Sequence, residues 1–275
     1  MEHHISRFLR KLEGHDYELE KRIFSMYRNV VRQKCCLECR RGLNVRIENC
    51  GHPVSFYVVG DKFRYEKYRV VFVGKTAWTN WERNPVDEES GFIDARIGTK
   101  DELFMPPWST TAFWQCIKEI CWKLWGICDP GDMWRRIMIT NIVKCTVVKG
   151  VPDKMKEYCI LKCRFLENEV KIVKPTHIIF FTCDNRDYYA RRCIFDYYIE
   201  KLDFGYDYSE DITDRDHKDK DIRTGWWHRI FIEDRRIRMH MLRVWHPREY
   251  QKRKIETKEK FAEKIADWIK KHCVE

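Results

Sequence analysis

The sequence predicts an α/β fold, a three-layer α/β/α arrangement around a central, mainly parallel, four-stranded sheet. Two observations predict it: short runs of β-branched and aromatic residues, and helical segments that separate those runs along the chain. The runs are residues 68–73, 137–145, 176–181 and 238–245. Strands that alternate with helices are typical of parallel sheets, whose crossover helices cover both faces.

Residues that end strands stand directly after two of these runs. Gly74 follows residues 68–73, and His246 follows residues 238–245. The run at 137–145 is nearly continuous in apolar residues and has no helical period, which is typical of a strand buried on both faces.

Four segments carry apolar residues at helical spacing. They cover residues 6–34, 110–125, 152–174 and 257–272. Ser109 or Thr110 can cap the second segment. The last segment is a basic helix that we expect to face the sheet through Phe261, Ile265, Trp268 and Ile269. Residues 75–107 show little periodicity and predict a long loop over the strand ends, and loops of that length are usually functional.

The length of 275 residues favours one domain, residues 1–275, with ample chain for a core. Residues 184–236 are the exception to the regular pattern, because they are rich first in tyrosine and then in acidic residues. We therefore expect this stretch to be an insertion within the domain.

The composition is 44% hydrophobic and 35% charged, with a formal charge of +10. These values suit a globular protein, and the positive excess fits a polyanion such as single- or double-stranded DNA. No apolar run approaches the roughly 20 residues of a membrane span, and the first residues lack the core of a signal peptide. We expect a cytoplasmic, monomeric protein.

Thirteen cysteines stand in a chain without a secretion signal. That context argues against a disulfide scaffold and directs attention to metal or cluster ligation. Even so, we expect most of these cysteines to be packing residues.

Two polar side chains stand at strand ends, Asn141 after one predicted strand and His246 after the last. In a parallel sheet both project from one edge, together with the loop after Gly74. An amide can accept from uracil N3–H and donate to O4, and a histidine can donate to the O2 of the departing base. Each residue also has a structural interpretation without catalysis. Asn141 can cap a loop, and backbone groups can satisfy the hydrogen bonds of the His246 ring.

Four motifs follow one another along the chain: Gly74 after an apolar strand, Asn141-Ile142-Val143-Lys144-Cys145, Cys163-Arg164-Phe165-Leu166 ahead of Pro175, and His246-Pro247 before a basic helix. Taken together, these motifs resemble those of the uracil-DNA glycosylase superfamily, most closely its iron–sulfur branch, often called family 4. The resemblance covers most of residues 30–183 and then 238–272. It implies a DNA glycosylase that flips out uracil, or a related damaged or modified base, and hydrolyses its bond to deoxyribose.

The resemblance also implies a 4Fe–4S cluster, which four thiolates hold. The matching residues are Cys36, Cys39, Cys145 and Cys163. Cys35 can replace Cys36, and Cys159 can replace Cys163. A structural zinc accepts the same ligands, and scattered core cysteines are the third interpretation.

Carried over from the family, Asn141 is the base reader and His246 the donor to the leaving base. The chain departs from the family at Lys75, where an acidic residue usually positions the attacking water. Glu82 follows the motif and is a candidate to take over that role. Other implied contacts are the backbone at Gly74, Phe92 as the ring that stacks on the base, and Arg248 at a phosphate or in the gap left by the base. The departure at Lys75 keeps an alternative open, a glycosylase-like protein that binds nucleic acid without cutting.

Overall fold

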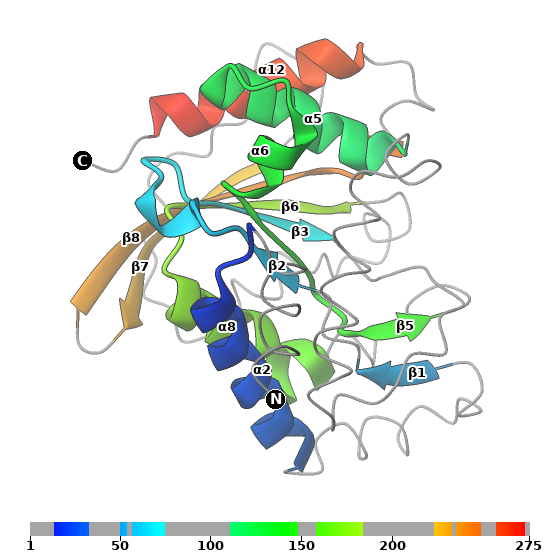
Figure 1. The fold of residues 1–275 in the computed structure, drawn as a ribbon, viewed down its shortest axis with the longest axis vertical. Helices are drawn as coiled ribbons and strands as arrows, with labels where there is room; N and C mark the ends of the chain where they lie inside the picture. Colours follow the sequence, from blue (N-terminus) through cyan, green and yellow to red (C-terminus); the bar gives the residue numbers. More distant parts are fainter. Residues whose placement is uncertain are drawn as a thin grey trace, which may run out of the picture.

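The computed structural model describes residues 14–32, 50–53, 57–74, 111–147, 158–183, 223–232, 235–248 and 257–272 (Figure 1). Its helices are α2 (Tyr17–Arg32), α5 (Ala112–Trp125), α6 (Pro130–Trp134), α8 (Phe165–Val173) and α12 (Lys258–Lys271), with a 3-10 turn η2 (Phe63–Tyr65) and a π-helical turn η4 (Tyr158–Lys162). Its strands are β1 (Cys50–Pro53), β2 (Tyr57–Val59), β3 (Val70–Gly74), β4 (Met138–Asn141), β5 (Cys145–Val147), β6 (His177–Cys183), β7 (Arg223–Ile232) and β8 (Arg235–Trp245).

Within the described residues, the main sheet has six strands in the order β2-β4-β3-β6-β8-β7. The inner strands β4, β3, β6 and β8 run parallel, and the edge strands β2 and β7 run antiparallel to their neighbours. The predicted α/β fold is confirmed in this general form, but the sheet is mixed and has six strands instead of four. The edge strand β7 comes from the predicted insertion, whose residues 184–222 lie outside the described ranges.

Helices lie on both sides of this sheet (Figure 1). On one side α12 packs on α5, with α6 beside them, and on the other side α2 packs on α8 and on β2. The α12 residues expected to face the sheet are all buried: Phe261, Ile265, Trp268 and Ile269. None of the described helices is long and apolar enough to cross a membrane.

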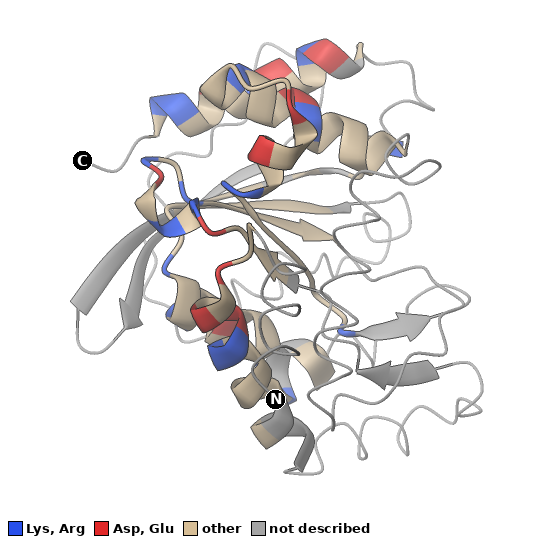
Figure 2. Ribbon diagram, in the orientation of Figure 1, with Lys and Arg blue, Asp and Glu red and all other residues tan. Residues whose placement is uncertain are grey.

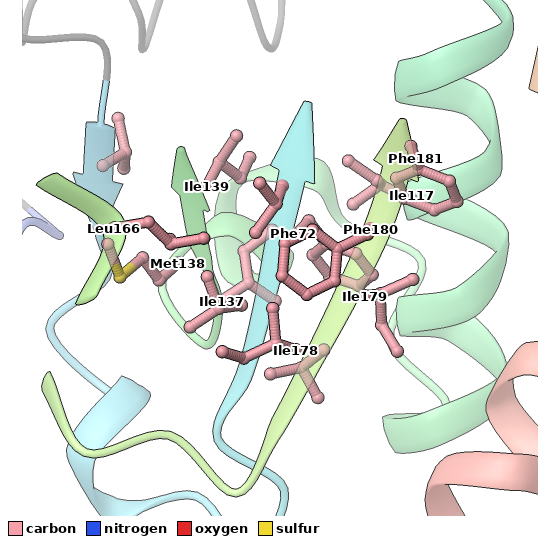
Figure 3. Close-up of a cluster of buried hydrophobic side chains, with 14 of the residues drawn as sticks. Phe72, Ile117, Ile137, Met138, Ile139, Leu166, Ile178, Ile179, Phe180 and Phe181 are labelled. Atoms are coloured by element: carbon pink, nitrogen blue, oxygen red, sulfur yellow. The ribbon is translucent and has the colours of Figure 1, made fainter. Parts of the chain in front are cut away.

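The core is built from the two faces of the parallel strands (Figure 3). Phe72 of β3 and Phe181 of β6 stack on the α5 side, with ring centroids 6.0 Å apart. Met138 of β4 and Leu166 of α8 belong to the same buried cluster. Consecutive strand residues point to opposite faces, so these strands are apolar on both sides, as the continuous apolar runs predict.

In the described part of the chain, the charged residues lie mainly on the helices and on the connections at the edge where the parallel strands begin (Figure 2). Four pairs tie residues 61–66 and their surroundings together at that edge: Lys62–Asp132, Arg64–Asp16, Arg135–Asp61 and Arg136–Glu66. Lysines and acids alternate along α12, so this helix does not form a surface of one sign.

Candidate active site

Gly74 and Asn141 end neighbouring parallel strands and are direct partners in the β3–β4 register. The Ile142 backbone N–H donates to the Gly74 carbonyl at 2.9 Å, which continues the ladder one residue past Asn141, and the chain bends at residues 142–143. The predicted strand 137–145 therefore stops at Asn141. Its remaining residues form a turn and the start of β5.

The Asn141 side chain occupies the space beside Gly74 in which another residue would place its Cβ. A Cβ at position 74 would lie 2.3 Å from Asn141 Oδ1 and 3.8 Å from the Phe113 ring. A Cβ cannot come within 3.0 Å of another atom unless something shifts. Gly74 is thus required by the close approach of the amide.

His246 lies near Asn141 and Gly74 because its ring packs on Phe113, at the start of α5. The His246 and Phe113 rings are stacked, 6.0 Å apart and inclined by 15°. Phe113 also meets Phe181 edge to face at 5.5 Å, which holds its ring over the end of β6. Asn141 and His246 therefore lie on one edge of the sheet, on its α5 side, with Phe113 next to both.

In the half-buried His246 ring, one hydrogen bond decides which nitrogen carries the proton. The Arg248 backbone N–H donates to His246 Nδ1 at 3.3 Å. A nitrogen that accepts a hydrogen bond carries no proton, so the neutral ring bears its proton on Nε2. His246 is consequently a donor through Nε2. The Arg248 side chain is exposed, and its contact with DNA stays a prediction.

Below the same strand end lies a buried polar cluster that the sequence did not predict. Lys144 Nζ lies 2.7 Å from Glu169 Oε1 and donates to Thr140 Oγ1 at 2.6 Å. The Tyr27 hydroxyl donates to the same Glu169 oxygen. Burial lowers the pKa of Lys144, and the adjacent Glu169 carboxylate acts in the opposite direction. We call these four residues the Lys144 cluster.

The cysteines are described only in part. Cys163 is buried between η4 and α8, and its sulfur is bonded to that of another cysteine, whereas Cys159 is buried as a thiol. Cys163 precedes Arg164, which has a left-handed φ of 50° and is paired with Glu167. The candidate ligands Cys35, Cys36 and Cys39 lie outside the described residues.

Cys145 begins β5, which pairs antiparallel with β1. The register sets Cys145 opposite Pro53 and Val147 opposite Cys50, so Cys50 shares a two-stranded ribbon with Cys145. Cys50 was not among the predicted ligands, although it lies eleven positions after Cys39 and directly before Gly51-His52. Among the residues that the structure describes, no group of three or more His, Cys, Asp or Glu side chains is arranged to hold a metal ion.

Three predicted site residues lie outside the described ranges: Lys75, Glu82 and Phe92. Phe113, in contrast, is described and was not predicted as a site residue. The sequence signal that could have identified Phe113 is its position two residues after Thr111, the N-cap of α5. A helix that follows a strand-end loop begins at the carboxyl edge of the sheet, so its first turn faces the site.

A small apolar cavity of about 20 Å³ lies between α5 and α6. It is lined mainly by apolar side chains, among them Trp114, Met133 and Ile137. This volume holds about one water molecule, so the cavity is too small for a nucleobase.

No protein-family model matches this sequence, and no characterised protein sequence matches it either. The resemblance to uracil-DNA glycosylases therefore rests on the motifs themselves.

Proposed function

We propose that the protein is a DNA glycosylase of the uracil type, which flips a uracil or a related base out of DNA and hydrolyses its glycosidic bond. The observation that carries the proposal is the meeting of Asn141 and His246 around Phe113 at one edge of the sheet. They are 105 positions apart in the chain. An amide and an imidazole donor at one edge are the two groups that recognition and departure of a pyrimidine require.

Asn141 would read the base. Its amide oxygen accepts from uracil N3–H, and its amide nitrogen donates to O4. Cytosine presents the opposite donor and acceptor pattern at these positions, so the same amide would leave buried polar groups unpaired. The enzyme would act on a base that has left the stack, at a cost of roughly a few kcal/mol.

His246 would stabilise the leaving base. Cleavage of the glycosidic bond leaves negative charge on the pyrimidine, and Nε2–H can donate to its O2. The hydrogen bond from the Arg248 backbone to Nδ1 supports this role, because it keeps the proton on Nε2. Loss of one such donor typically lowers kcat about 10²–10³-fold.

An assay on uracil-containing oligonucleotides, followed by alkaline strand scission, tests the proposal. We expect wild-type protein to produce abasic sites and His246→Ala to lower kcat about 10²–10³-fold. His272→Gln is the matched control, because His272 is also half-buried but lies beside His177 at the opposite end of the strands. If wild-type protein loaded with its metal produces no abasic sites, the enzyme proposal is wrong.

Lys75 favours a second candidate function, nucleic-acid binding without cleavage. A lysine cannot replace the carboxylate that positions water, and the chain carries it directly after Gly74. This function predicts binding that weakens steeply with salt. It also predicts that Lys75→Glu gains excision or changes nothing, and a loss of excision in that variant would contradict it.

We further propose that four thiolates, from Cys36, Cys39, Cys145 and Cys163, hold a 4Fe–4S cluster. The Cys163 sulfur is bonded to another cysteine sulfur, and reduction of that bond would give two neighbouring thiolates at the start of α8, which supports Cys163 over Cys159. When bound, such a cluster would cross-link the three chain segments that carry its ligands. Zinc is the competing occupant, with Cys50 as an additional candidate ligand for either.

Anaerobic purification separates the two metals. A 4Fe–4S cluster colours the protein brown, and its charge-transfer absorption accompanies iron in metal analysis, whereas a zinc protein is colourless. Cys163→Ser should lower the bound metal, and Cys128→Ser is the control because Cys128 is an exposed thiol.

A further inference from the structure

The Lys144 cluster places a charged pair deep inside the protein, directly under the proposed site. The side chains of Lys144 and Glu169 have no exposed surface. Long charged side chains are almost never fully buried unless they are paired, and replacing such a pair with apolar residues is often neutral or stabilising. The cluster is therefore poorly explained as a source of stability alone, which directs attention to what it holds in place.

The cluster joins three segments of the chain. Thr140 and Lys144 belong to the end of β4 and the turn after it, Glu169 to α8, and Tyr27 to α2. The Thr140 hydroxyl lies 3.0 Å from Glu169 Oε2, and the Lys144 ammonium lies 5.7 Å from the centre of the Tyr27 ring. Glu169 thus contacts both ends of the turn, through Thr140 and Lys144, and Tyr27 connects it to α2.

The turn at residues 141–144 is held from both faces of the sheet. Successive residues of a strand point to opposite faces, so Thr140 reaches the α8 side while Asn141 reaches the α5 side beside Gly74. At the sheet edge, the Ile142 N–H donates to the Gly74 carbonyl. On the α8 side, the Lys144 ammonium is paired with the Glu169 carboxylate.

We infer that the Lys144 cluster positions Asn141, fixing the turn so that the amide is presented beside Gly74 at the edge of the sheet. Lys144, Glu169 and Tyr27 are positioning residues and do not touch the base. The benefit for base reading rests on the proposed function, whereas the fixation of the turn does not depend on it. The Ile142 amide reports the turn directly, because its hydrogen bond to Gly74 breaks when the turn opens.

Hydrogen exchange tests this inference. Tyr27→Phe removes one hydroxyl and keeps the ring, and we expect the Ile142 amide to exchange about tenfold faster, as the loss of a hydrogen bond to a charged group implies. The reference is the Lys62 amide, which donates to the Arg135 carbonyl at 2.8 Å beside the opposite end of β4. Its exchange should stay unchanged. Lys144→Met should give a larger effect of the same kind, and Tyr27→Phe decides the question if Lys144→Met does not fold.

Asp61→Asn is the matched control variant. It removes the ion pair with Arg135, whose atoms lie 2.6 Å apart at the opposite edge. We expect it to speed exchange of the Lys62 amide and to leave the Ile142 amide unchanged. Equal acceleration of both amides in Tyr27→Phe, or none at Ile142, would overturn the inference, because the cluster would then act on global stability or not at all.

Kinetics distinguish this inference from the proposed function. If wild-type protein excises uracil, Tyr27→Phe should lower kcat about tenfold with DNA affinity unchanged, since the phosphate contacts do not pass through the cluster. An unchanged kcat in that variant would contradict the role of the cluster in base reading. If wild-type protein excises no base, the proposed function fails, and the Ile142 exchange alone decides whether the cluster fixes the turn.

Discussion

At position 74, space decides which residue the chain can accept. Asn141 Oδ1 already occupies the volume of a Cβ there, and the Phe113 ring closes the next side. Both neighbours belong to the proposed site, so the cheapest response to a larger residue would be a displaced amide. The same glycine therefore links packing at the end of β3 to the position of the amide that we propose reads the base.

Gly74→Ala should displace the Asn141 side chain. We expect a loss of stability of about 1–3 kcal/mol from overpacking, and a fall in uracil excision of about a hundredfold from the misplaced amide. Thermal denaturation and the oligonucleotide assay measure the two effects.

Gly126→Ala is the matched control for this prediction. Gly126 ends α5 with a φ of 69° and has no atom within 4 Å of its Cβ position. An alanine there costs about 1–2 kcal/mol from the left-handed conformation and should leave excision unchanged. A large loss of excision in Gly126→Ala would mean that stability, and not the amide, sets the activity.

Among the secondary-structure elements, α12 shows what local sequence signals can predict. Thr257 is its N-cap, with a side chain that accepts from the Lys260 backbone N–H at 3.3 Å. Thr257→Ala should destabilise the protein by about 1 kcal/mol, whereas Thr257→Ser should keep the cap and nearly all of the stability. Urea denaturation measures both, and equal losses would show that the cap hydroxyl contributes nothing.

The elements that the sequence predicted are those that contain a clear apolar run or a helical period. The strands now seen as β3, β4, β6 and β8, and the helices α2, α5 and α12, each follow from an apolar run or a helical spacing. The strands β1, β2 and β5 contain three or four residues and α6 contains five, so they are too short to show a period. The break after Asn141 was missed for another reason: the Lys144 cluster, which we infer fixes the turn, includes Glu169, 25 positions after Lys144, and no local pattern reveals that partner.

The candidate site was predictable only where the topology alone decides it. Parallel strands bring their carboxyl ends to one edge, so Asn141 and His246 could be expected together before any coordinates. The start of α5 points Phe113 to this edge, but its contact with His246 could not be predicted, because the contact depends on how α5 lies across β6 and β8. The Lys144 cluster is likewise invisible in sequence, since a lysine beside a cysteine reads as a surface residue unless its acid partner is known.

At the scale of the whole molecule, His177 ties the opposite end of the sheet to α12. Its ring is fully buried at the start of β6, and its Nε2–H donates to the His272 carbonyl at 2.9 Å. His240, its register partner on β8, stacks on it at 5.4 Å. Burial lowers the pKa of His177 to about 3 from 6.5; the charges of His240, His272 and Arg69 add to this effect, and the hydrogen bond to the His272 carbonyl opposes it.

Because the folded pKa of His177 is lowered, the protein should lose stability as the pH falls. Below about pH 6.5 the unfolded chain binds a proton at His177, whereas the folded protein does not bind it until about pH 3. This one group should therefore remove about 2 kcal/mol of the unfolding free energy between about pH 6.5 and pH 4.5. Urea midpoints across that range measure the slope. His177→Gln should be less stable at neutral pH yet show a flatter slope, and an equal slope in this variant would assign the pH dependence to other groups.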